Sequence, residues 1–307
     1  MYSARIWFNY RLEPVGIGFA EWPLMQTGTL IATGLLVVGV ASAGVAGQQR
    51  VRVNAAQSKA SASVLSEHET DVLDAMTPQQ QAELLLERSI NRYHGANAQI
   101  EARVDGWRGK ITLNDRLNNL FLTGINSDDL TVRAAALEVD IAARNLEKNS
   151  AAVDRLEPEA REGAQGPRAN ALWDLGLLGN RGVEPERVAQ ILLSSIHDEN
   201  VNVRYWAVEG LAYLATDETI HPLLEIFRSD PSPMIRERAA CGLAQSGMLS
   251  QKQRRTAVPK LLDFADEFSL DSQMRLWVFQ ALRDITGQSL PHDPIAWRRW
   301  YDLNGAR

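Results

Sequence analysis

Five arginines recur at similar spacing between residues 133 and 275. They are the residues best suited to chemistry, because guanidinium groups bind carboxylates and phosphates through paired hydrogen bonds. A small or β-branched apolar residue stands three positions after each arginine, and a leucine stands four positions further on in every copy except the first, which has Asp140. The pattern indicates either a row of ligand-binding arginines or a repeated structural contact. The arginines are 32 to 39 residues apart and are Arg133, Arg168, Arg204, Arg236 and Arg275.

Side chains that carry catalysis in other proteins are few and scattered. His68-Glu69 is a single His-Glu pair, and the sequence has no nucleophile elbow, no phosphate-binding glycine loop, no HExxH motif and no Cys/His cluster with zinc spacing. Cys241 has no histidine near it in the sequence, so we expect a buried or inert thiol. We therefore predict no catalytic residue, no metal site and no cofactor. The histidines are His68, His94, His197, His221 and His292.

The spacing of the arginines is too long for one helix and suits a pair of helices, so it predicts a stacked α-helical array. Apolar residues recur at helical intervals, and no segment shows sustained period-two alternation, so we expect an all-α fold without a sheet. We expect first helices at 183–196, 218–228 and 251–268, and second helices at 202–214, 234–245 and 274–285.

Two strings carry a resemblance to a known family. Asp198…Val203-Arg204-x-x-Ala207-x-x-x-Leu211 and Asp230…Ile235-Arg236-x-x-Ala239-x-x-x-Leu243 resemble HEAT repeats, particularly those of bacterial HEAT-like proteins. The resemblance covers roughly residues 112–288, and it implies a right-handed solenoid of stacked antiparallel helix pairs. The first two copies depart from the pattern: Asp140 replaces an apolar residue, and a loop at 158–167 replaces a clear first helix.

The resemblance also assigns the arginines a role. In HEAT-like arrays such arginines usually reach turn residues or helix ends in neighbouring repeats, and Asp198, Asp230 and Asp271 stand at the expected turns. Charge-assisted hydrogen bonds would suit that structural role. A ligand-binding row remains the alternative.

The second helices of such arrays line a concave face. There the positions rotated away from the core are unusually apolar, which is typical of a surface that binds a partner segment. The alternative is that neighbouring helices cover these residues. Our candidate partner-binding residues are Trp173, Tyr205, Val208, Leu276 and Phe279.

The ends of the chain predict four further segments. A charge-free stretch runs from Trp22 to Gln49. It predicts that residues 1–47 are either a signal peptide or a membrane anchor that crosses through residues 24–47. Residues 48–76 are polar and predict a flexible linker. We expect an N-terminal helical cap at 77–111 and a C-terminal capping helix at 289–307. Trp297, Trp300 and Tyr301 of that helix would seal the last repeat.

Charge and composition exclude some functions. The net charge of −6 comes without a basic stripe, which argues against nucleic acid and against a DNA-repair enzyme of the HEAT-like type. The di-iron hydroxylases built on HEAT repeats need several His-Glu pairs on inner helices, and this sequence has only His68-Glu69, so it does not resemble them in this respect. We predict a non-catalytic protein-interaction or scaffolding protein, exported across or anchored in the bacterial cytoplasmic membrane. A HEAT-like lyase or another ligand-handling enzyme is the alternative.

Overall fold

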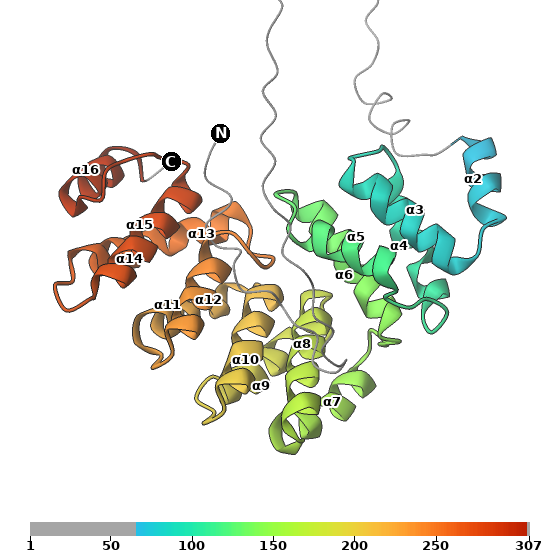
Figure 1. Ribbon diagram of the computed structural model, residues 1–307, viewed down its shortest axis with the longest axis horizontal. Coiled ribbons are helices and arrows are strands. Elements are labelled where there is room, and N and C mark those ends of the chain that lie inside the picture. Colours follow the sequence, from blue (N-terminus) through green and yellow to red (C-terminus); the bar gives the residue numbers. More distant parts are fainter. Residues whose placement is uncertain (1–65, 306–307) are drawn as a thin grey trace, which may run out of the picture. The chain divides into compact units, whose positions relative to one another are not determined.

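The computed structural model describes residues 66–305, and every regular element in that range is helical (Figure 1). The predicted signal or anchor segment (1–47) and most of the predicted linker lie outside the described residues. No helix between residues 66 and 305 combines the length and apolar character needed to cross a bilayer. The elements are α2 (Glu67–Asp74), α3 (Pro78–Ile90), α4 (Ala96–Trp107), α5 (Asp115–Ile125), α6 (Leu130–Ala143), α7 (Ser150–Glu162), α8 (Gln165–Asn180), α9 (Pro185–Ser195), α10 (Val201–Leu214), the 3₁₀ turn η1 (Asp217–Thr219), α11 (Ile220–Ser229), α12 (Pro233–Ala244), α13 (Gln251–Thr256), α14 (Val258–Asp266), α15 (Ser272–Thr286) and α16 (Pro294–Asn304).

The helices from α7 onward form stacked pairs (Figure 1). The pairs are α7 with α8, α9 with α10, α11 with α12, and α14 with α15. The second helices also pack on one another in chain order, so α8 contacts α10, α10 contacts α12 and α12 contacts α15. Helices α3 to α6 pack mainly among themselves at the N-terminal end, and α16 packs on α14 at the other end. The chain therefore buries its apolar stripes between successive helices.

Local capping explains where several helices begin. Thr77 caps α3 in a capping box with Gln80, and Pro78 follows it at the first helical position. Asp271 caps α15, and Asp293 caps α16 just before Pro294. Gly287 ends α15 at φ 70°, a left-handed conformation that glycine adopts without the steric cost other residues incur. These starts and stops need only residues close in sequence.

The end of the predicted flexible linker (48–76) is helical, so that part of the prediction is wrong. Helix α2 begins after Ser66, whose hydroxyl accepts from the backbone N–H of Glu69 while the Glu69 carboxylate accepts from the backbone N–H of Ser66. Leu73 anchors the helix, with 1% of its surface exposed. The polar composition of the segment concealed the capping box and the apolar anchor Leu73, although Ser-x-x-Glu is the sequence pattern of a capping box.

The expected loop at 158–167 is also wrong, because α7 continues through Pro158 to Glu162 and only residues 163 and 164 separate it from α8. Pro158 lies on the exposed side of α7, where water can solvate the carbonyl that the missing N–H would have bonded. A buried stripe holds the helix together across the proline. Its members are Ala152, Val153, Leu156 and Ala160.

The expected helix at 251–268 is divided into α13 and α14 at Ala257. Pro259 stands in the first turn of α14, a position where the lack of a backbone N–H costs no hydrogen bond. Because of this division, α13 takes its own direction and places Arg254 against the end of α12.

The backbones of α8 and α10 approach each other closely. A Cβ at Gly176 would stand 2.7 Å from the Cα of Gly210 and 2.8 Å from its carbonyl oxygen. This approach is possible only without side chains, and it leaves α8 buried from Ala171 to Gly179. At the C-terminal end, Trp297 is fully buried and donates from Nε1 to the carbonyl of Pro291 at 2.9 Å.

Candidate interaction surface

The repeated arginines link each turn to the next along the array. Arg168 donates to the Asp198 carboxylate at 2.5 Å, and Arg204 donates to both oxygens of Asp230 at 2.9 and 3.2 Å. Arg236 approaches Asp271 at 3.9 Å. Each aspartate stands in the turn of the following pair, so the three contacts form one ladder. We call these three pairs the arginine ladder.

The arginines of the ladder also bind their own turns. Arg204 and Arg236 each donate to the carbonyl six residues earlier, at 2.8 and 3.0 Å. Burial raises the pKa of Asp198, but the backbone N–H of Asn200 and the guanidinium of Arg168 outweigh it, so this pKa lies below its usual value. The carboxylate is therefore charged at neutral pH, and the guanidinium groups of Arg168 and Arg204 are each engaged by an aspartate and a backbone carbonyl, whereas the Nε of Arg236 is buried without a hydrogen-bond partner among the described residues.

The first and last arginines lie outside the ladder. Arg275 belongs to the last pair, and its side chain makes no hydrogen bond or ion pair within residues 66–305. Arg133 keeps the contact with its own turn, at the carbonyl of Ser127 (2.5 Å), but its Nη1 donates to the carbonyls of Gln245 and Gly247 at 2.7 and 2.6 Å. Those carbonyls lie where α12 ends, whereas the ladder lies where the second helices begin.

A segment we call the 245–249 loop therefore receives two arginines. Arg254 is 4% exposed and donates to the carbonyls of Gly242, Leu243 and Leu249 at 3.2, 2.8 and 2.9 Å, and to those of Gln245 and Ser246 at 3.2 and 2.8 Å. Burial lowers the pKa of Arg254 to about 10, and the nearby charge of Arg133 acts in the same direction. Sequence reasoning missed Arg254, since its partners are backbone atoms that no motif marks.

Two buried carboxylates share one arginine at the junction of α6 and α8. Arg144 donates from Nε to Asp140 at 2.9 Å and from Nη1 to Asp174 at 3.3 Å. Trp173 donates from Nε1 to the second oxygen of Asp140 at 3.0 Å. Burial raises the pKa of Asp174 to about 7 against the opposing charge of Arg144, and the Asp140 charge adds to the rise. The aspartate that departs from the repeat pattern at position 140 thus has a role in joining α6 to α8.

Aromatic rings connect α8 and α10. Trp173 meets Tyr213 edge to face at 4.7 Å and Trp206 at 5.9 Å, and Trp206 meets Tyr205 at 5.6 Å. Beside them, Arg238 of α12 pairs with the buried carboxylate of Glu209. Burial and the Glu209 carboxylate raise the pKa of Tyr205 above its usual range. This cluster binds three successive second helices through polar as well as apolar contacts.

The candidate partner-binding residues differ in their exposure to solvent. Trp173, Val208 and Phe279 are buried, with 6%, 1% and 3% of their surfaces exposed, and Phe279 is covered by the stacked ring of His292 at 5.1 Å. Tyr205 is half-buried, and Leu276 is 46% exposed. A partner that meets the protein in this conformation therefore reaches Leu276 and part of Tyr205. Partner binding at these positions stays a prediction.

Cys241 and the side chains that could bind a metal are the remaining candidates for chemistry among residues 66–305. Burial raises the pKa of Cys241 to about 12, so the thiol is protonated at neutral pH and a poor nucleophile. Between residues 66 and 305 no group of three or more His, Cys, Asp or Glu side chains could hold a metal ion. Asp140, Asp174 and Glu209 on the inner helices are each paired with an arginine.

Comparison with known proteins points to one family. The family model of HEAT repeats matches residues 153–244, which run from α7 to the end of α12 and contain two of the three ladder pairs in full. A search of curated proteins returned no match.

Proposed function

Because the chain is a HEAT-repeat protein, with repeats matched over residues 153–244, we propose that it works as a non-catalytic protein-interaction or scaffolding module. HEAT repeats commonly mediate contacts between proteins. The partner would be a protein segment that docks on the face formed by the second helices α10, α12 and α15.

The arginine ladder is the observation that carries this proposal. Its ion pairs fix each turn against the next, so the second helices are held at one spacing before any partner arrives. Association costs less free energy when the surface does not have to be ordered during binding. A row of helices whose turns are linked by ion pairs suits recognition by shape.

The chemistry of the partner is inferred from one repeat position. The residues immediately after the arginines of α10, α12 and α15 are Tyr205, Glu237 and Leu276, which are half-buried, half-buried and exposed. The carboxylate of Glu237 accepts no hydrogen bond within residues 66–305, and burial raises its pKa above the usual value. A partner segment with apolar side chains beside Tyr205 and Leu276 and one basic side chain beside Glu237 would complement all three residues.

Substitution at the exposed position tests the proposal. Leu276→Asp would abolish partner capture from the native host, whereas Val72→Asp, which changes a 42% exposed residue on α2, would leave it intact. A photo-reactive side chain at position 276 would cross-link the same partner, and one at position 72 would not. Equal capture by both variants would refute docking on this face. Phe279 is a poor test position, because its burial would make Phe279→Asp unfold the last pair.

We also propose export or membrane anchoring, supported by the charge-free stretch from Trp22 to Gln49 and by the small residues at Ala41-Ser42-Ala43 and Gly44-Val45-Ala46. The N-terminus of the mature protein, read by mass spectrometry, tests this. A start at Gly44 or Gly47 would indicate a secreted protein, and an intact segment in the membrane fraction would indicate an anchor. An intact N-terminus in the soluble fraction would refute both.

One observation favours the alternative of a ligand-handling enzyme, namely a buried carboxyl, Asp174, whose pKa lies near neutrality. Both carboxylates at that junction are nevertheless bonded to Arg144, and Asp140 is bonded to Trp173 as well. If the carboxylates of Asp140 and Asp174 bound a ligand, Asp174→Asn would abolish binding of that ligand without loosening the α6–α8 junction.

A further inference from the structure

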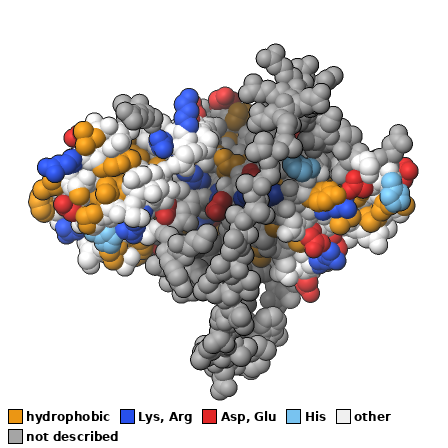
Figure 2. Space-filling view, turned by 90° about the horizontal axis from the view of Figure 1, so that it is seen from above, with side chains coloured by type: hydrophobic (Ala, Val, Ile, Leu, Met, Phe, Trp, Pro, Cys, Tyr) orange, Lys and Arg blue, Asp and Glu red, His pale blue; other side chains and the backbone are white. Residues whose placement is uncertain are grey.

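The C-terminal end of the array exposes three large hydrophobic side chains. Phe268, Ile295 and Leu303 are 93%, 73% and 74% exposed, the highest values among the large hydrophobic residues between 66 and 305. In the space-filling view, hydrophobic side chains gather at the end that carries α14 and α16, with charges of both signs between them (Figure 2). Exposed hydrophobic side chains that gather in one region mark interaction sites more often than single scattered ones do.

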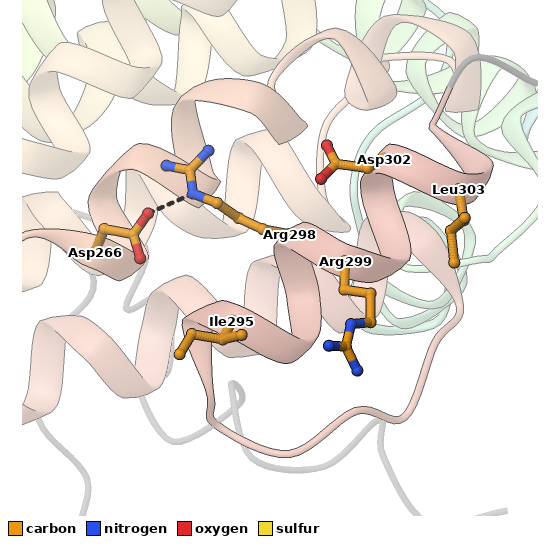
Figure 3. A pocket seen from close by; sticks show the side chains of 6 residues that line it. All are labelled: Asp266, Ile295, Arg298, Arg299, Asp302 and Leu303. Atoms are coloured by element: carbon orange, nitrogen blue, oxygen red, sulfur yellow. Dashed lines mark hydrogen bonds and ion pairs between the residues drawn. The ribbon is translucent and has the colours of Figure 1, made fainter.

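A shallow cavity of 530 Å³ is lined by two of these side chains, Ile295 and Leu303 (Figure 3). Ile295, Arg299 and Asp302 follow one another at i, i+4 and i+7 on α16, so they share one face of the helix, and Leu303 adjoins it. Arg298 turns away to bind Asp263 (3.0 Å) and Asp266 on α14, which fixes α16 in place. We call Ile295, Arg299, Asp302 and Leu303 the α16 patch.

Two opposite charges on the α16 patch have no partner of their own. The side chains of Arg299 and Asp302 make no hydrogen bond or ion pair within the described part of the chain, while the neighbouring Arg298 makes two ion pairs. One unpaired cation and one unpaired anion, three residues apart on a helix, are self-complementary. This arrangement suits a partner that presents the same two charges in the reverse order.

We propose that the α16 patch binds a second copy of this chain, as an isologous dimer with the two α16 helices antiparallel. A two-fold axis midway between positions 299 and 302 sets Arg299 against Asp302 of the partner copy and, by symmetry, Asp302 against Arg299. In that register Leu303 comes within one helical turn of Ile295 of the other copy. Burial of the apolar side chains supplies the affinity, and the two reciprocal ion pairs set the register.

The charges make an anionic lipid surface a poorer fit. The patch and its immediate ion pairs contain Arg298 and Arg299 against Asp263, Asp266 and Asp302, so the local balance is acidic. Anionic membranes attract basic patches and repel acidic ones. A second copy satisfies the apolar groups and both unpaired charges together.

Charge reversal tests the register directly. The full-length chain, purified in mild detergent, would show a concentration-dependent dimer by native mass spectrometry and sedimentation. Arg299→Asp and Asp302→Arg would each weaken the homodimer by about tenfold or more, since each sets like charges against one another. An equimolar mixture of the two variants, one carrying a mass tag, would form a heterodimer, because both of its contacts are complementary again.

The double variant Arg299→Asp/Asp302→Arg is the matched control and would dimerise like the wild type, and circular dichroism would show equal helicity in all four proteins. Each contrary result overturns the proposal. A wild type that stays monomeric, single reversals that dimerise unchanged, or a mixture that fails to pair would each exclude this interface. Monomers that bind anionic vesicles and lose that binding on Leu303→Asp would make the occupant a lipid surface instead. Leu276→Asp would leave the dimer intact, so this test is independent of the partner-docking experiment.

Discussion

Arg133 and Arg254 donate to the same carbonyl oxygen, that of Gln245, although Arg133 comes from α6 and Arg254 from α13. The Nη1 of Arg133 lies 2.7 Å from this oxygen and the Nη2 of Arg254 lies 3.2 Å from it. Two guanidinium groups of like charge tolerate each other here because the carbonyls that end α12 form the negative end of a helix dipole. The shared oxygen connects the N-terminal helices to the third pair of the array.

Arg254→Met is expected to lower the free energy of unfolding by about 3 kcal/mol or more, because it leaves several buried carbonyls without donors. Lys252→Met on the exposed side of α13 is the matched control and should change stability by less than about 0.5 kcal/mol. Urea unfolding followed by circular dichroism would measure both. Equal midpoints for the two variants would show that water replaces the guanidinium.

The arginine ladder predicts that replacing an arginine by methionine lowers stability much more at position 204 than at position 275, although the two positions are equivalent in the repeat. Arg204→Met strands the buried carboxylate of Asp230 and should cost about 3–5 kcal/mol. Arg275→Met in the last pair, where no further turn of the array comes after it, should change stability by no more than about 0.5 kcal/mol. Thermal unfolding of the two variants checks the contrast. A comparable loss of stability at both positions would contradict the view that the arginine stabilises the protein by binding the aspartate of the next turn.

The contact of α8 with α10 predicts a steric penalty. Gly176→Ala would place a methyl group 2.7 Å from the backbone of Gly210 and should cost about 1–3 kcal/mol by forcing the helices apart. Gly166→Ala in the same helix meets nothing within 4 Å and should be neutral or stabilising by up to about 1 kcal/mol. Chemical unfolding distinguishes these outcomes, and a neutral Gly176→Ala would show that the two helices adjust freely.

Asp174 predicts a pH dependence of stability. Its pKa in the folded state, about 7, lies above the ordinary value of 3.8, so the folded protein holds a proton that the unfolded chain releases. Stability from this group is therefore fully present below about pH 4 and falls as the pH rises to about 7, by at most about 4 kcal/mol. Asp174→Asn keeps an acceptor for Arg144 without a charge.

Urea unfolding at pH 5 and pH 8 measures this effect as the difference between wild type and Asp174→Asn. The variant should gain stability over the wild type at pH 8 and much less at pH 5, and taking the difference cancels the contribution of other titrating groups. The same difference at both pH values would mean that Asp174 ionises normally in the folded protein.

Features that depend only on neighbours along the chain could be predicted from the order of the amino acids. Thr77, Asp271 and Asp293 cap helices where their types indicate, and the spacing of the arginines indicated helix pairs with aspartates in the turns. Caps and helical periodicity act over a few residues, so they can be recognised without a structure. The α16 patch was only partly visible in this way: the sequence indicated the helix and its aromatic residues, and which charges stay unpaired depended on α14.

The roles of residues with distant partners came from the packing of the helices. Arg133 shares the sequence pattern of the ladder arginines, but its Nη1 donates to carbonyls at the end of α12, because the packing of the helices brings the first turn of α6 beside that end. In the same way Val208 and Phe279 occupy surface positions of their repeats by pattern and are buried in the structure. A repeat motif specifies how a helix meets its neighbour, whereas burial and long-range hydrogen bonds depend on where the whole stack of helices places each face.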